Sequence, residues 1–88
     1  MFSGTWSIRV VDKHSQGIVG AEVSYQGNQI SGADTKYTDN DGWVAFEMDE
    51  SLLPGPPFTV HEVWIEGENV VHSPLKPNDG DKFSFMLP

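Results

Sequence analysis

The sequence predicts an all-β domain, a seven-stranded antiparallel β-sandwich. No stretch sustains the apolar spacing of an amphipathic helix. Nine glycines and six prolines interrupt the chain at short intervals, and short runs of alternating apolar and polar residues lie between them. Short strands separated by turn residues are typical of a two-sheet sandwich. The 88 residues, 1–88, are enough for one such domain with a thin core.

Seven segments carry the strand pattern. In chain order they are residues 5–11, 20–26, 35–38, 43–48, 58–66, 69–73 and 82–87. Alternation predicts the buried face of most of them, because successive side chains of a strand point to opposite sides of a sheet. The inward-facing sets are Trp6, Ile8 and Val10; Ala21, Val23 and Tyr25; Val44, Phe46 and Met48; Phe83, Phe85 and Leu87.

The fifth segment, residues 58–66, breaks this alternation. Its apolar residues change parity between Val60 and Val63. One explanation is a β-bulge near His61 or Glu62, which restores the register by inserting one residue. The alternative is that both faces of this strand are covered, which would also bury Trp64.

Composition narrows the class of partner. Thirteen acidic and five basic residues give a net charge of −8, which repels phosphate backbones and anionic lipid surfaces, so we expect neither nucleic acid nor membrane as a partner. The chain has no cysteine, which excludes disulfides and thiolate metal sites. Neither a signal peptide nor a membrane span is visible. We therefore expect a cytoplasmic protein or a domain of a larger exported one, of undetermined oligomeric state.

The stretch TDNDGWVAF, residues 38–46, offers two interpretations. Asp39, Asn40 and Asp41 before Gly42 resemble part of a calcium loop, but Met48 stands where such a loop needs a bidentate glutamate. Asp, Asn and Gly between two strand patterns are also what a tight turn requires. We predict the turn, with a positive φ at the glycine, and a second turn of this kind at PNDGD, residues 77–81.

Two stretches, VVDKHSQGIVGAEVSY and TKYTDNDGWVAFEM, resemble the signature of transthyretin-like and carboxypeptidase-regulatory-like domains. The matching positions are Asp12, Gly17, Gly20, Ala21, Val23, Thr38, Asp39, Gly42, Val44 and Phe46. LLPGPPFTV resembles the entry of that family into its next strand. The resemblance implies a Greek-key sandwich of the transthyretin-like or immunoglobulin-like kind. It describes folding and says almost nothing about chemistry.

Two chemistries known on related folds do not fit these residues. Hydroxyisourate hydrolases carry a catalytic histidine near the place of Arg9 and end in Tyr-Arg-Gly-Ser, whereas this chain ends FSFMLP. Pilin-type sandwiches form a Lys–Asn crosslink, but Val10 stands at the lysine position and KFSFML has no asparagine. We therefore expect no enzyme and no catalytic residues.

Two further features have plain structural explanations. His61, Glu62 and His72 would meet across a hairpin, but two histidines and a carboxylate make a thin ligand set, and we expect no metal and no cofactor. The apolar loop SLLPGPP, residues 51–57, fits a plug for one end of the sandwich better than an interaction edge.

The aromatic residues supply the candidate binding site. Alternation turns Trp43 away from the face that holds Val44, and together with Tyr37 and Trp64 it would form an exposed platform. The alternative is a Trp43 half-buried against a neighbouring strand or loop. The acidic side chains of Glu47 and Glu62 would orient a basic partner.

We therefore expect a non-catalytic module that binds another protein, within a larger extracellular, surface or secretion-spike assembly. The first alternative is a carbohydrate-binding accessory domain that stacks sugars on the same aromatics. A small hydrolase related to the transthyretin-like enzymes is the weakest alternative.

Overall fold

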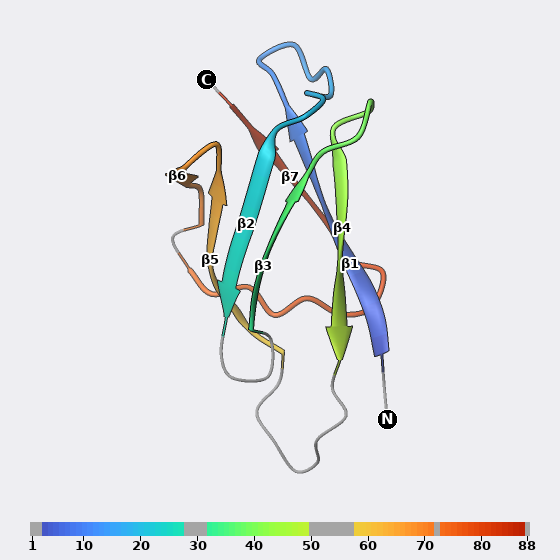
Figure 1. Cartoon of the computed structure of the whole chain (residues 1–88), viewed down its shortest axis with the longest axis vertical. Helices are drawn as coiled ribbons and strands as arrows, with labels where there is room; N and C mark the ends of the chain where they lie inside the picture. Colours follow the sequence, from blue (N-terminus) through green and yellow to red (C-terminus); the bar gives the residue numbers. More distant parts are fainter. Residues whose placement is uncertain (1–2, 28–31, 50–57, 72, 88) are drawn as a thin grey trace.

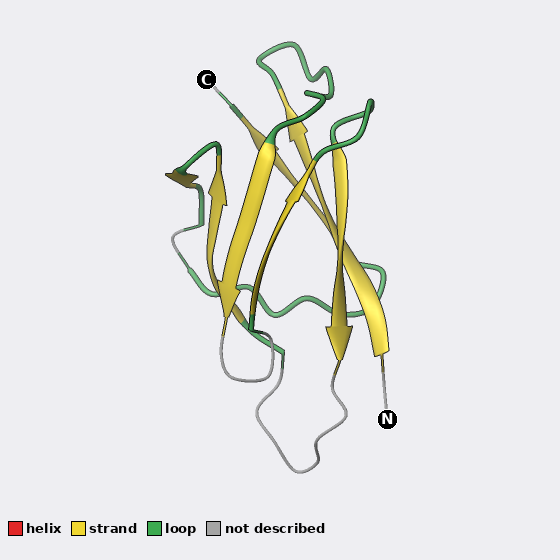
Figure 2. Ribbon diagram, in the orientation of Figure 1, coloured by secondary structure: helices red, strands yellow, loops and turns green. Residues whose placement is uncertain are grey.

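Two β-sheets pack face to face in the computed structural model, which describes residues 3–27, 32–49, 58–71 and 73–87 (Figures 1 and 2). The strands of these residues are β1 (Ser3–Val11), β2 (Glu22–Gly27), β3 (Ala33–Tyr37), β4 (Trp43–Asp49), β5 (Val60–Ile65), β6 (Glu68–Asn69) and β7 (Lys82–Met86). The all-β prediction is confirmed. Within the same ranges, no helix is long and apolar enough to cross a bilayer.

The sheets hold three and four strands. Sheet A has the order β4-β1-β7 and sheet B the order β3-β2-β5-β6. All pairs are antiparallel except β1 and β7, which run parallel from Ser7 opposite Lys82 to Val11 opposite Met86. The prediction of a purely antiparallel sandwich is therefore wrong for this pair. Its physical reason is the connection from β6 to β7, which carries the chain from sheet B to sheet A, so that β7 enters beside β1 in the same direction.

The predicted inward faces form one shared core. Its buried apolar residues are Trp6, Ile8, Val10, Ala21, Val23, Tyr25, Val44, Phe46, Met48, Phe58, Val60, Val63, Ile65 and Val71. At its centre Trp6 of β1 lies 5.2 Å from the rings of both Tyr25 and Phe46, measured between ring centroids. The Trp6 to Tyr25 contact joins sheet A to sheet B, so β1 lies over β2. The Nε1 atom of Trp6 is buried without a hydrogen-bond partner among the described residues.

The apolar residues of β7 also face this core but are less well covered. Phe83, Phe85 and Leu87 pack against it and stay partly exposed. Their predicted direction is confirmed, and their incomplete burial follows from the position of β7 at the edge of sheet A.

The parity change in the fifth segment comes from a β-bulge. Gln26 pairs with Glu62, whereas the next residue, Gly27, pairs with Val60, so His61 is the extra residue. Val60 and Val63 are both buried as a result, while Trp64 is only partly buried. The bulge explanation is confirmed, and the alternative with Trp64 in the interior is not needed.

The sixth strand is shorter than predicted, two residues in place of five. The side-chain oxygen of Asn69 accepts the N–H of Val71 at 3.0 Å. This local turn follows the last contact of the ladder, in which the Val70 N–H donates to the Val63 carbonyl at 2.9 Å. Among the described residues that follow, Leu75 bonds β5 again, because its N–H and its carbonyl both bond Val60 at 2.8 Å.

Two glycines let the β1–β2 connection cross the turn before β4 at very short distance. A Cβ on Gly17 would lie 2.0 Å from the carbonyl oxygen of Asp41, and a Cβ on Gly42 would lie 2.5 Å from that of Val10. Gly42 also has the predicted positive φ, of 85°. Only glycine meets both conditions, because other residues add a Cβ and disfavour this φ.

Replacement of Gly42 tests this crossing against a matched control. We expect Gly42→Ala to lower the free energy of unfolding by about 3 kcal/mol, because it adds backbone clash to left-handed strain. Gly67→Ala introduces comparable strain at φ 84° but meets open space, so we expect a loss of about 1 kcal/mol. Urea denaturation of both variants measures the difference. Equal losses would contradict the close crossing.

Candidate functional site

The three aromatic residues of the predicted platform do not share one face. Trp43 lies on the outer face of sheet A, where it pairs with Arg9 of β1, and the guanidinium carbon of Arg9 lies 5.8 Å from the centroid of its ring. Tyr37 and Trp64 lie on the outer face of sheet B, opposite Glu22 and Ser24 of β2. Both tryptophans are partly buried, whereas Tyr37 is 64% exposed.

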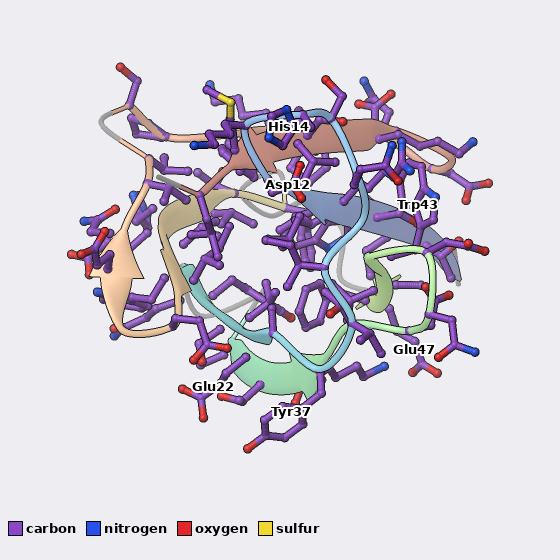
Figure 3. All side chains as sticks on the ribbon, turned by 90° about the horizontal axis from the view of Figure 1, so that it is seen from above. Asp12, His14, Glu22, Tyr37, Trp43 and Glu47 are labelled. Carbon is purple, nitrogen blue, oxygen red and sulfur yellow. The ribbon has the colours of Figure 1, made fainter. Side chains whose placement is uncertain are left out.

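The two acidic candidates divide in the same way. Glu47 lies on β4 four residues after Trp43, opposite Thr5, and is exposed on the outer face of sheet A. Glu62 pairs with Gln26 on the outer face of sheet B. Figure 3 shows Trp43 and Glu47 together on one side of the domain. The predicted residues therefore form two groups, Trp43 with Glu47 and Tyr37 with Trp64 and Glu62.

A compact group of side chains gathers at one end of sheet B, around the start of β2. The hydroxyl of Tyr37 lies 3.3 Å from Oε2 of Glu22, and the two residues lie side by side in Figure 3. Oε1 of Glu66 accepts the N–H of Glu22 at 2.9 Å. Two carboxylates and one phenol thus occupy adjacent positions on β3, β2 and the end of β5.

An exposed apolar side chain borders this group. Val19 is 61% exposed and lies beside Gly20, whose N–H donates to the carbonyl of Thr38 at 3.0 Å. Since Thr38 follows Tyr37, the two exposed apolar residues lie on adjacent segments. We call Val19, Glu22, Tyr37 and Glu66 the acidic corner.

Hydrogen bonds to β2 hold Glu66 in this position although its backbone is strained. It has a positive φ of 52° and, with Gly67, forms the two-residue turn between β5 and β6. Turns of this kind prefer Asn or Asp followed by Gly, because φ is positive at both positions. The N–H of Glu66 donates to the carbonyl of Glu22 at 2.9 Å, so the strained residue is held to β2 by its backbone and by its carboxylate.

Sequence reasoning missed three members of the acidic corner, Val19, Glu22 and Glu66. Alternation with the inward Ala21 and Val23 places Glu22 on the outer face of its strand, but its neighbours on other strands depend on register, which one sequence does not specify. The Glu-Gly pair at 66–67 was the available signal, since it marks a two-residue hairpin.

The DNDG stretch is a turn in which the Asp39 carboxylate serves the backbone. Its Oδ1 accepts the N–H of Asp41 at 2.9 Å and that of Trp43 at 3.0 Å. The Asp39 N–H donates to the Trp43 carbonyl at 2.9 Å, and the Gly42 N–H donates to the Asp39 carbonyl at 3.0 Å. The predicted turn is confirmed. The turn at residues 78–81 is confirmed as well, by the Asp81 N–H bond to the Asn78 carbonyl at 3.0 Å.

The loop after β1 repeats this arrangement. Oδ1 of Asp12 accepts the N–H of His14 at 2.8 Å and that of Gln16 at 3.1 Å. Ser15 takes the place of Gly42, with a φ of 63°. The two family-like aspartates therefore have the same role, which is to close five-residue turns at the same end of the sandwich.

These hydrogen bonds alter the acidity of both aspartates. The N–H groups of Trp43 and Asp41 lower the pKa of Asp39, and those of Gln16 and His14 lower the pKa of Asp12. The cause is that each bond favours the ionised carboxylate.

No metal site is evident in the described ranges, where no three His, Asp or Glu side chains are placed to hold an ion. His61 is exposed, but His72 lies outside the described residues, so the predicted pair is not described. The apolar loop at 51–57 lies outside them too.

Searches of protein-family models, curated proteins and solved structures found no match to this chain.

Acid should destabilise the fold through Asp12 and Asp39. A pKa that is lower in the folded chain stabilises the fold above the ordinary aspartate pKa, and this stabilisation is lost as the pH falls through that value and below. We expect Asp39→Asn, whose amide oxygen still accepts both N–H bonds, to flatten the decline of the melting temperature below about pH 4. Thermal unfolding monitored by circular dichroism across this range measures it, with Asp41→Asn as the control.

Proposed function

We propose that this chain is a non-catalytic module that binds a positively charged surface of another protein through the acidic corner. One observation carries the proposal: Tyr37 is 64% exposed, its hydroxyl donates to the Glu22 carboxylate, and the backbone N–H of Glu22 holds the carboxylate of Glu66 beside it. Exposed tyrosines are frequent centres of protein interfaces because they bury a large ring at small entropic cost.

The charge distribution supports a basic partner. The outward positions of β3, β2 and β5, together with the turn after β5, carry Glu22, Glu62 and Glu66 and no lysine or arginine. The one lysine or arginine of these three strands is Lys36, which has inward parity and reaches the Ala45 carbonyl of β4 at 3.0 Å. Such a face attracts a basic surface and raises its association rate.

We also propose that the domain belongs to the transthyretin-like group. The roles of the family-like residues support this: Gly17 and Gly42 make the close crossing, and Asp12 and Asp39 close the two equivalent turns. Such a fold carries many functions, so the binding proposal depends on the acidic corner and not on the family.

Affinity capture with matched variants tests the binding proposal. The immobilised wild-type domain and Trp43→Ala, which alters the opposite sheet, should retain the same basic protein. Tyr37→Ala should weaken its binding at least about tenfold, the effect expected of an interface hot spot. Tyr37→Phe keeps the ring and should retain most of the affinity. Isothermal titration with the purified partner measures these values.

Charge and sugar controls complete this test. Glu66→Gln keeps an oxygen for the Glu22 N–H and should weaken binding while reducing its salt dependence. Loss of binding in Trp43→Ala alone would contradict the proposal in favour of the outer face of sheet A. A saturable shift of tryptophan fluorescence with polysaccharides, with no protein retained, would favour a carbohydrate-binding domain.

A further inference from the structure

The outer edge of β7 differs from the other sheet edges of this domain. An edge strand presents backbone N–H and carbonyl groups that pair readily with another strand, and stable proteins usually block them. Sheet A ends at β4 and β7, and sheet B ends at β3 and β6.

The edge of β4 is blocked at Trp43 and Ala45 by two side chains and a turn. Both backbone groups of Trp43 bond Asp39, its N–H to the carboxylate at 3.0 Å and its carbonyl to the N–H at 2.9 Å. The carbonyl of Ala45 accepts a bond from Nζ of Lys36 at 3.0 Å. A strand arriving at β4 would have to displace all three bonds.

The edges of sheet B are also protected in part. On β3 the Asp34 carboxylate accepts the N–H of Thr35 at 2.8 Å. The outer edge of β5 is covered by the two-residue β6 and by Leu75, which exchanges two bonds with Val60.

No comparable contact protects β7 in the described part of the chain. The Ser7 N–H donates to the carbonyl of Asp81, and the Leu87 N–H donates to that of Val11, both at 2.9 Å. Backbone N–H and carbonyl groups alternate in direction along a strand, so those of the odd-numbered residues of β7 point to β1. Lys82, Ser84 and Met86 therefore direct their N–H and carbonyl groups to the free edge.

Sheet A is also one strand narrower than sheet B. β1 lies over β2, as the Trp6 to Tyr25 contact shows, and β4 lies beside β3 through Lys36. β7 then lies over β5, and no strand of sheet A lies over β6 and Leu75. Five of the six partly buried apolar residues against the core belong to this side, namely Val70, Leu75, Phe83, Phe85 and Leu87.

We propose that the free edge of β7 accepts one extended segment of a partner protein as an eighth strand. Its inward side chains are apolar, because alternate positions would cover Phe83, Phe85 and the overhanging Leu75. We expect an acidic residue on the outward side of this partner segment, because the outward positions of the paired residues 7–11 and 82–86 carry Arg9 and Lys82 and no carboxylate. Met86 adds an apolar side chain that is 63% exposed.

A single strand fits this edge better than a second copy of the domain. If β7 paired with β7 of a second copy, the β5 strand of that copy would fall on the place that β6 of the first domain, which extends beyond β7, already occupies. The net charge of −8 per chain further opposes self-association. This surface is distinct from the acidic corner, so the inference stands independently of the proposed function.

Residue-resolved amide exchange with a designed peptide tests the proposal. The probe is acetyl-ITVTVE-amide, which in antiparallel register sets valines opposite Phe83 and Phe85 and its glutamate opposite Lys82. In the dilute protein alone, the amides of Ser84 and Met86 should exchange rapidly and that of Phe85 slowly. With saturating peptide, exchange at Ser84 and Met86 should slow at least about tenfold.

Two controls isolate the edge. The peptide acetyl-ITVPVE-amide lacks the N–H opposite Ser84 and should give no protection. Ser84→Pro removes only an edge-directed N–H, which edge strands tolerate, and should keep the circular dichroism spectrum while weakening the peptide at least about tenfold.

Three results would overturn the inference. Slow exchange at Ser84 and Met86 in the dilute protein would mean that the edge is already covered. Failure of the first peptide to protect them would mean that the edge accepts no strand. Protection that grows with protein concentration and accompanies a dimer in sedimentation would assign the edge to a second copy.

Discussion

The crossing of Gly17 over Asp41 and Gly42 is the constraint on which the domain depends. It holds the β1–β2 connection, which passes from sheet A to sheet B, against the turn that returns the chain to sheet A. The two equivalent aspartate turns fix the backbone on either side of this contact. With no disulfide and a core of modest size, a backbone contact of this kind determines how the sheets align.

Alignment of the sheets accounts for both proposed surfaces. Because β1 lies over β2, sheet B extends one strand beyond sheet A at β6, so β6 and Leu75 have no strand of sheet A over them beside the free edge of β7. At the other side of sheet B, the register of β3 and β5 on β2 sets Tyr37 and Glu66 on either side of Glu22. The acid-rich outer face of sheet B and the basic outward positions beside β7 are thus consequences of one strand arrangement.

Local features of this fold were predictable from the sequence, and long-range ones were not. Alternation predicted the inward faces, the parity change predicted the bulge at His61, and Gly42 was assigned its positive φ correctly. The parallel pairing of β7 with β1 escaped prediction because alternation contains no information on strand order. For the same reason, alternation did not predict that Trp43 lies on a different sheet from Tyr37 and Trp64, or that the residues of the acidic corner lie together.

The most direct test of the central contact is a nuclear Overhauser measurement between the α protons of Gly17 and Gly42. A Cβ at Gly42 would lie only 2.8 Å from the Cα of Gly17, so we predict a strong cross-peak. Absence of this cross-peak in a folded sample with both resonances assigned would contradict the sheet alignment described above.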